Sequence, residues 1–266
     1  MNYILIAIVL LVPTCSDVRN AKEISENVLK RELIIYCENA MVAPLIKLKD
    51  NFELNNNCIV TLNNDCAQNL SSLIRYRQKG DLYLPASSSG FQKLSDQYLN
   101  YIVDSVFIGY NNLVIMALKG NPTGFNGTLE DLADKKHALK IANPETCSLG
   151  YDTRRMLEGE NLYNKVLLNV VSLSTDSRGL VKSLINNEAQ LVVNWQSDLY
   201  NNEYGKEVEV FRVYGDNHAP SEIYAGILST SDYPELAKEF LEYATSAEGI
   251  SVFKSYGFNR RKSLIF

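Results

Sequence analysis

The most constraining feature of this chain is a regular alternation of short apolar segments with amphipathic ones. Segments 33–37, 58–62 and 82–84 are nearly continuous runs of Val, Ile, Leu and Tyr, as in strands buried on both faces of a parallel sheet. Polar residues follow each run, and after the first two of them apolar residues recur at helical spacing. This alternation predicts an α/β doubly wound sheet, whose ligands bind beyond the carboxyl ends of the strands.

A second set of such units follows after two further apolar strands, at 103–108 and 112–118. It contains predicted strands at 139–142, 166–171 and 191–195, with helices between them. Because no Gly/Ser-rich linker separates the two sets, we predict two lobes, each a mostly parallel sheet flanked by helices. A two-strand hinge would join them, with crossings near 113–118 and 221–226. The predicted division is lobe I at 33–112 plus 221–266 and lobe II at 113–220.

The N-terminus predicts export. Residues 4–12 form an unbroken apolar run that is too short to span a bilayer as a helix and is typical of a secretory signal. We assign 1–15 to a signal peptide and 16–32 to a polar tether. The sequence Val-Pro-Thr-Cys ending at Cys15 resembles a lipoprotein cleavage box. The protein would then be periplasmic or on the cell surface, either lipid-anchored through Cys15 or released by simple cleavage.

The composition excludes several classes of function. A net charge of −5 and the absence of a dense Lys/Arg stripe argue against nucleic acid as a partner. The two histidines are isolated in the sequence, and the spacing of the cysteines after Cys15 matches no zinc pattern. We therefore expect neither a metal nor a cofactor.

The loop at 141–150 is the strongest candidate for binding. A short apolar strand ends in Asn143 and Pro144, and small or polar residues then open a helix. The first N–H groups of a helix have no partner within it, so a helix start can bind an anion without any charged side chain. We predict that this loop forms one side of a ligand cleft.

Several segments resemble the substrate-binding proteins of molybdate-type ABC importers, which have the two-lobed periplasmic binding protein type II fold. Tyr36 to Met41 reads Tyr-Cys-Glu-Asn-Ala-Met, where that branch of the family has a Tyr-Cys-Gly-Ala-Gly-Met-like start. Other matching segments, in the same order along the chain, are 79–85, 119–122, 128–133, 142–150, 194–198 and 246–258. The resemblance implies that a monomer holds a small tetrahedral oxyanion, such as molybdate or tungstate, between its lobes and delivers it to an ABC permease.

The resemblance also implies a set of ligand-binding positions. The hydroxyl donors of the family would fall at Asn39 or Ala40 and at Cys66 or Ala67, so both hydroxyls are missing here. Leu149, in the loop with Cys147, and Ser177 match main-chain N–H donors, and Trp195 matches an aromatic donor position. The predicted site is Asn39, Ala40, Cys66, Ala67, Cys147, Leu149, Ser177 and Trp195.

The same mapping places Cys37, Cys66 and Cys147 at strand ends that face the cleft. Three interpretations stay open. Cys37 and Cys66 could form a disulfide, since an exported chain can form such bonds. All three could be ordinary buried residues. Alternatively, the thiols could bind a thiophilic ligand such as arsenite, or select another oxyanion such as selenite or phosphate.

A sensory binding protein and an enzyme on the same fold are the alternatives to transport. A sensory binding protein, whose closed form engages a histidine-kinase ectodomain, would have the same sequence features. An enzyme on the same fold would need an acid–base pair or an activated nucleophile in the cleft. The cleft loops offer Glu38, Asp65 and Glu145 but no His, so we predict that the protein is not an enzyme.

Overall fold

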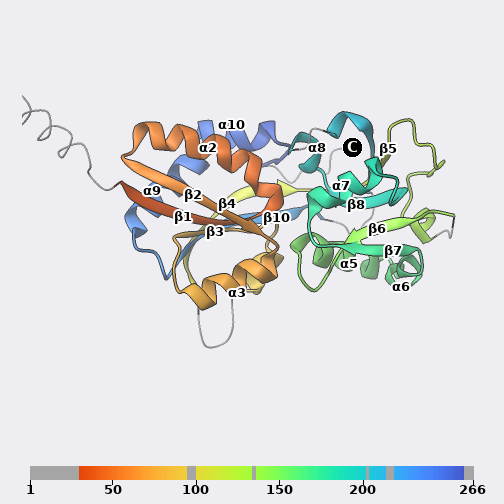
Figure 1. Ribbon diagram of the computed structural model, residues 1–266, viewed down its shortest axis with the longest axis horizontal. Coiled ribbons are helices and arrows are strands. Elements are labelled where there is room, and N and C mark those ends of the chain that lie inside the picture. The colour runs from red at the N-terminus through yellow and green to blue at the C-terminus, as the bar shows by residue number, and fades with distance from the viewer. Residues whose placement is uncertain (1–29, 95–99, 134–135, 202–203, 214–218, 261–266) are drawn as a thin grey trace, which may run out of the picture.

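The computed structural model of the chain describes residues 30–94, 100–133, 136–201, 204–213 and 219–260. Two five-stranded sheets form two lobes that lie side by side along the long axis (Figure 1). The predicted signal peptide, Cys15 and most of the predicted tether lie outside the described residues. Among the residues described, no helix is both long and apolar enough to cross a membrane.

The sheet of lobe I has the strand order β2-β1-β3-β10-β4. β1 pairs in parallel with β2 and β3, whereas β10 is antiparallel to both β3 and β4. The strands are β1 (Arg31–Glu38), β2 (Cys58–Asp65), β3 (Leu82–Leu84), β4 (Ile102–Asn111) and β10 (Ser221–Leu228). The helical elements of this lobe are η1 (Asn39–Met41), α2 (Val42–Asn55), α3 (Ala67–Arg77), α4 (Ser89–Gln92), α9 (Pro234–Thr245) and α10 (Ala247–Ser255).

The sheet of lobe II has the order β7-β6-β8-β5-β9 and repeats the same plan. β6 is parallel to β7 and β8, and β5 is antiparallel to β8 and β9. The strands are β5 (Leu113–Leu118), β6 (Leu139–Ala142), β7 (Val170–Ser174), β8 (Leu191–Trp195) and β9 (Val208–Arg212). The helical elements are η2 (Glu130–Ala133), α5 (Ser148–Gly159), α6 (Tyr163–Leu167), α7 (Ser177–Ile185), α8 (Asp198–Asn201) and η3 (Gly205–Glu207).

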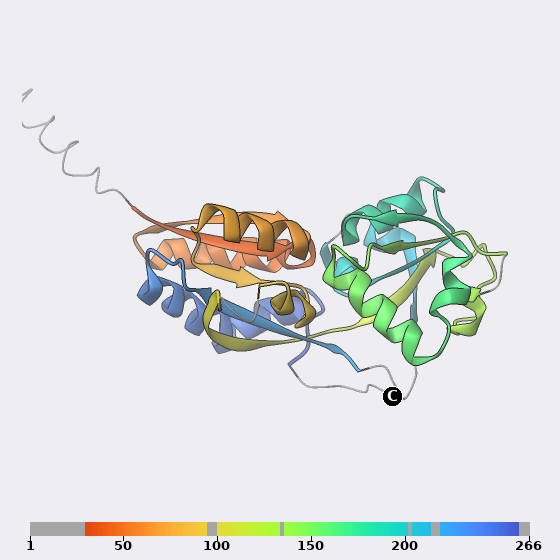
Figure 2. The same ribbon diagram turned by 90° about the horizontal axis from the view of Figure 1, so that it is seen from below.

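The structure confirms the two-lobed α/β architecture, with sheets that are mixed instead of mostly parallel. In each sheet, every antiparallel pair contains a strand that lies next to a point where the chain crosses between the lobes. The chain leaves a lobe on one strand and returns to it on another that runs in the opposite direction, so these strands pair antiparallel. The first crossing is at Asn112, between β4 and β5. Figure 2 shows β4 and β10, which are paired, extending from lobe I toward lobe II.

Strand β1 divides the core of lobe I into two layers. Side chains alternate between the faces of a strand, so Leu33, Ile35 and Cys37 pack with the apolar side chains of α2, α9 and α10. Tyr36 lies on the opposite face, with the apolar residues of α3. In Figure 1, α2 and α10 lie above this sheet and α3 lies below it.

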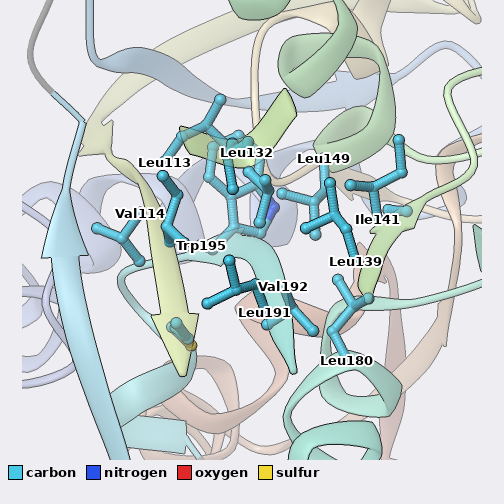
Figure 3. Close-up of a cluster of buried hydrophobic side chains, with 14 of the residues drawn as sticks. Leu113, Val114, Leu132, Leu139, Ile141, Leu149, Leu180, Leu191, Val192 and Trp195 are labelled. Carbon is cyan, nitrogen blue, oxygen red and sulfur yellow. The ribbon is translucent and has the colours of Figure 1, made fainter. Parts of the chain in front are cut away.

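In lobe II the buried apolar side chains on the two faces of the sheet belong to one contiguous cluster. In Figure 1, α7 lies above the sheet and α5 and α6 lie below it. The fully buried side chain of Trp195, at the end of β8, lies among Leu113, Leu132 and Leu149 (Figure 3). Because Leu149 belongs to the first turn of α5, this packing fixes the start of α5 at the sheet edge.

A buried carboxylate ties the N-terminal strand to the last third of the chain. Asp81, only 2% exposed, accepts hydrogen bonds from the Ile34 N–H at 2.7 Å, the Ser231 hydroxyl at 2.6 Å and the Tyr233 N–H at 3.3 Å. Without the carboxylate the Ile34 N–H and the Ser231 hydroxyl would lose this acceptor, whereas the Tyr233 N–H would keep its bond to the Ser231 hydroxyl oxygen at 3.2 Å.

We expect Asp81→Ala to lower the free energy of unfolding by roughly 2–4 kcal/mol, because the Ile34 N–H would be left unpaired and the Ser231 hydroxyl would lose its bond to a charged acceptor. Urea denaturation followed by circular dichroism measures this change. The exposed Asp50 on α2 provides the control, and Asp50→Ala should change stability by less than about 0.5 kcal/mol. Equal losses in the two variants would contradict this role of Asp81.

Candidate ligand cleft between the lobes

The carboxyl ends of strands from both lobes meet around one small pocket. The loops after β1, β2 and β3 line it from lobe I, and the loops after β6 and β7 together with the end of β8 line it from lobe II. The cavity left between them is about 20 Å³, room for about one water molecule. Its lining residues are Glu38, Asn39, Ala40, Asp65, Cys66, Ala86, Cys147, Leu149, Thr175, Asp176, Ser177 and Trp195.

The Glu38 carboxylate occupies the centre of the contact between the lobes. Its Oε2 accepts the Ala86 N–H of lobe I at 2.8 Å, and its Oε1 accepts the Ser148 N–H of lobe II at 3.1 Å. The Ala67 N–H also donates to this carboxylate. Ala67 and Ser148 are the first residues of α3 and α5, so two helix N-termini point at one acid group, where their dipoles favour negative charge.

Glu38 is only 5% exposed, and its environment acts on its pKa in two directions. Burial raises the pKa of the carboxyl above its ordinary value, while the nearby Ser148 hydroxyl and the N–H donors of Ala86, Ser148 and Ala67 act to lower it. No ion pair with a Lys or Arg is found for Glu38 within the described parts of the chain. Neutral dipoles are therefore what stabilises this buried charge.

A tight turn positions the start of α5. The Asn143 carbonyl accepts the N–H groups of Thr146 and Cys147, and the Asn143 side chain accepts the Glu145 N–H at 3.0 Å. A Cβ atom on Gly150 would lie 2.4 Å from the Asn143 carbonyl group, so only glycine lets the helix approach this turn. The turn leaves the Ser148 N–H directed at Glu38.

Two thiols from opposite lobes lie next to each other beside Glu38. Cys66 is the N-cap of α3 and Cys147 the N-cap of α5. The Cys147 thiol donates to the Thr175 carbonyl at 2.7 Å and interacts with the Cys66 thiol. This interaction lowers the pKa of Cys66 and raises that of Cys147, so the thiolate forms on Cys66 first.

The placement of Cys37 corrects one expectation. Its side chain does not face the cleft, because it shares the face of β1 occupied by Leu33 and Ile35. Cys66 packs in the other cluster, with residues of lobe II, and both thiols are free. The Cys37–Cys66 disulfide is therefore not formed in this structure, and the neighbour of Cys66 is Cys147.

The structure brings the eight predicted positions together. Seven line the pocket, namely Asn39, Ala40, Cys66, Cys147, Leu149, Ser177 and Trp195. The eighth, Ala67, contributes its N–H to Glu38. Sequence reasoning missed Glu38 as a site residue, although it stands at a glycine of the family-like motif, and it also missed the main-chain donors of Ala86 and Ser148.

Direct hydrogen bonds hold the lobes together around the pocket. The Arg178 guanidinium of α7 donates to the Asn39 side-chain oxygen at 2.8 Å. The Gln68 N–H donates to the Thr146 carbonyl at 3.0 Å, and the Lys93 ammonium donates to the Glu145 carbonyl at 2.9 Å. These contacts and the small cavity describe a closed arrangement of the two lobes.

The other two acidic residues of the cleft loops serve local structure. Asp65 accepts the Cys66 N–H at 2.7 Å and the Asn69 side-chain amide at 3.1 Å, at the start of α3. Glu145 is exposed and pairs with Arg154 at 2.7 Å. Neither is arranged with Glu38 as an acid–base pair.

A second buried carboxyl lies behind the pocket. Asp198, at the start of α8, is fully buried next to Ser177. Neither its carboxylate oxygens nor the Ser177 hydroxyl has a hydrogen-bond partner of good geometry. Burial raises the pKa of Asp198 to about 7, so this group changes charge near neutral pH.

This shift predicts a pH-dependent stability. Because the pKa is raised in the folded state, the contribution of Asp198 is fully present below its ordinary pKa and is lost as the pH rises through about 7. Asp198→Asn cannot ionise, so its stability relative to wild type should increase by a few kcal/mol between about pH 5 and about pH 8. Urea titrations at both pH values measure this, with Asp50→Asn as the exposed control. A difference independent of pH would contradict the shift.

Solved structures of similar shape are two-lobed binding proteins. The periplasmic molybdate-binding protein of Azotobacter vinelandii matches with a TM-score of 0.72 and 14% identity, over 86% of this chain and 99% of that one. Iron-bound HitA from Pseudomonas aeruginosa matches with a TM-score of 0.66 and 16% identity, over 88% and 90%. At these identities the likeness concerns the fold alone.

Comparisons of sequence identify the family as well as the fold. The chain is 24% identical over 251 residues to YvgL of Bacillus subtilis strain 168, described as an ABC transporter substrate-binding lipoprotein, with 94% of this chain and 93% of that protein covered. The family model for bacterial extracellular solute-binding proteins matches residues 33–259. Since that match spans most of the chain, the protein belongs to the bacterial extracellular solute-binding protein family.

Proposed function

We propose that the protein captures a small oxyanion between its lobes and presents it to the permease of an ABC importer. Membership of the solute-binding family supports a transport role and a membrane partner, and this family is not one of enzymes. The observation that carries the ligand class is the convergence of main-chain N–H groups from both lobes on the carboxylate of Glu38. A carboxylate is an oxyanion, and helix N-termini accept other oxyanions in the same way.

The proposed ligand is a tetrahedral anion of the molybdate or tungstate type. The Azotobacter vinelandii neighbour is named for molybdate, whereas HitA is described with iron, so the fold does not select the ligand. In lobe II the Ser177 hydroxyl, on a residue only 6% exposed, lines the pocket beside the Asp198 carboxyl and is a donor that a bound oxyanion would engage. The ligand would contact Asn39, Ala40, Cys66, Ala67, Cys147, Leu149, Ser177 and Trp195.

The proposed location is outside the cytoplasmic membrane. The family is extracellular, and the Bacillus subtilis relative is described as a lipoprotein. We propose that Cys15 is the lipidated first residue of the mature chain and that the residues before β1 act as a tether. A lipid anchor there would keep the binding protein near its permease.

A thermal-shift screen tests the ligand class. A ligand at about 100 times its Kd stabilises the folded state by about 2.7 kcal/mol, which should raise the Tm by roughly 5–10 °C for a protein of this size. The screen covers molybdate, tungstate, sulfate, phosphate, arsenate and selenite. No change in Tm with any of them would contradict oxyanion binding.

A matched pair of serine variants places the ligand. Ser177→Ala removes the hydroxyl that lines the pocket and should weaken the binding of a responding anion by roughly tenfold, as one lost hydrogen bond to a charged group does. Ser72→Ala, on the exposed side of α3, should leave the Kd unchanged. Equal Kd values by isothermal titration calorimetry for the two variants would place the anion elsewhere.

A second ligand class is favoured by the thiol pair. Arsenite is neutral As(OH)₃ near neutral pH, and it can condense with the Cys66 and Cys147 thiols to form two As–S bonds with release of two waters. Thiolate formation on Cys66 favours the first attack. We expect Cys66→Ser to abolish an arsenite-induced rise in Tm and to leave any response to molybdate. Cys58→Ser, in the lobe I core away from the pocket, is the control, and a response that survives in Cys66→Ser would exclude this site.

A further inference from the structure

The structure assigns to Glu38 a role that the proposed function leaves open. We propose that Glu38 is the specificity-determining residue of the cleft, a resident carboxylate that an incoming oxyanion must displace. The same carboxylate joins the two lobes. This inference rests on the proposed function and names the side chain that competes with the oxyanion for the cleft.

Main-chain N–H groups from both lobes donate to the Glu38 carboxylate. Glu38 is held by the N–H groups of Ala67 and Ser148 at the starts of two helices and by the N–H of Ala86 after a third strand. These groups are the N–H donors that a cleft between two lobes offers to a bound anion. The side chain therefore sits in the place of the ligand.

The cleft has too little space to hold both the Glu38 carboxylate and a tetrahedral oxyanion. The cavity that remains beside Glu38 is about 20 Å³, which holds about one water molecule. A tetrahedral oxyanion has four oxygens around its central atom and does not fit beside the carboxylate. The carboxylate has to leave before such a ligand can enter.

A second negative charge beside the Glu38 carboxylate is unfavourable. A dianion next to a buried carboxylate would be repelled, because little solvent screens the two groups. No ion pair with a cation is found for Glu38 among the described residues, so no direct ion pair offsets this repulsion. Shape and charge both make Glu38 and the ligand compete.

The Glu38 carboxylate also bridges the two lobes. Ala67 and Ala86 belong to lobe I and Ser148 to lobe II, so one carboxylate spans the interface. Closure in this family of folds is the event that a ligand brings about by contacting both lobes. Here a side chain of the protein makes the same kind of contact, which favours the closed arrangement.

The experiment compares wild type with Glu38→Gly and Glu38→Gln. Glycine is the residue at this position of the family-like motif, and glutamine keeps the shape while it removes the charge. Isothermal titration calorimetry with molybdate, sulfate and phosphate should give a Kd at least roughly tenfold lower for Glu38→Gly than for wild type. Glu38→Gln should fall between them. Glu32→Gln, an exposed position on the same strand, should match wild type.

Small-angle X-ray scattering of the same proteins without ligand tests the bridge. Wild type and Glu32→Gln should be compact, and Glu38→Gly should show a larger radius of gyration that decreases when the anion is added. Far-UV circular dichroism checks that each variant is folded, and Glu38→Gln carries the comparison if Glu38→Gly is not.

The outcomes separate this inference from the proposed function. If wild type and both Glu38 variants bind the same anion with equal Kd, the inference is wrong and oxyanion transport stands. If none of these proteins binds any of the anions, oxyanion binding is wrong. The scattering then decides the role of Glu38, since an unchanged radius of gyration in both variants would overturn it and an increase would support it.

Discussion

The contact on which the rest of this structure depends is the set of main-chain hydrogen bonds to Glu38. Ala67 and Ser148, at the starts of α3 and α5, supply two of them from opposite lobes. Each helix start is fixed by its own lobe, α3 by the core beneath β1 and α5 by the packing of Leu149 against Trp195. The carboxylate can therefore accept the N–H groups at both helix starts only when the lobes are closed. Its hydrogen bonds thus depend on the relative position of the two lobes.

Neutral dipoles suit a protein that must release what it binds. An arginine in the same place would hold an anion by its full charge, and release of the anion would require that direct ion pair to be broken. Main-chain N–H groups at a helix start separate when the lobes separate, and water can then replace the ligand at each of them. The same reversibility applies to Glu38, whose buried charge becomes solvated as the lobes open.

Part of this arrangement follows from the sequence and part does not. The alternation of apolar strands and helices predicts the two α/β lobes, and the loop before α5 is predicted to line the cleft between them. The alternation of side chains along β1 also explains the position of Cys37, which lies on the same face of the strand as the core residues Leu33 and Ile35. The contact of Glu38 with Ser148 joins residues 110 positions apart and depends on how the lobes close, which no local pattern encodes. Glu38 stands where the family-like motif has a glycine, so a match of hydroxyl positions alone does not reveal it.

These observations explain how one scaffold can serve different ligands. The starts of α3 and α5 offer N–H groups because a helix begins after a strand there, whatever the side chains are. Selectivity must therefore come from the few side chains placed between those helices, here Glu38 and the thiols of Cys66 and Cys147. A carboxylate lowers the affinity for free anions, and adjacent thiols add a chemistry that hydroxyl groups lack. Under the proposed function, the choice of ligand then depends on these three side chains more than on the fold.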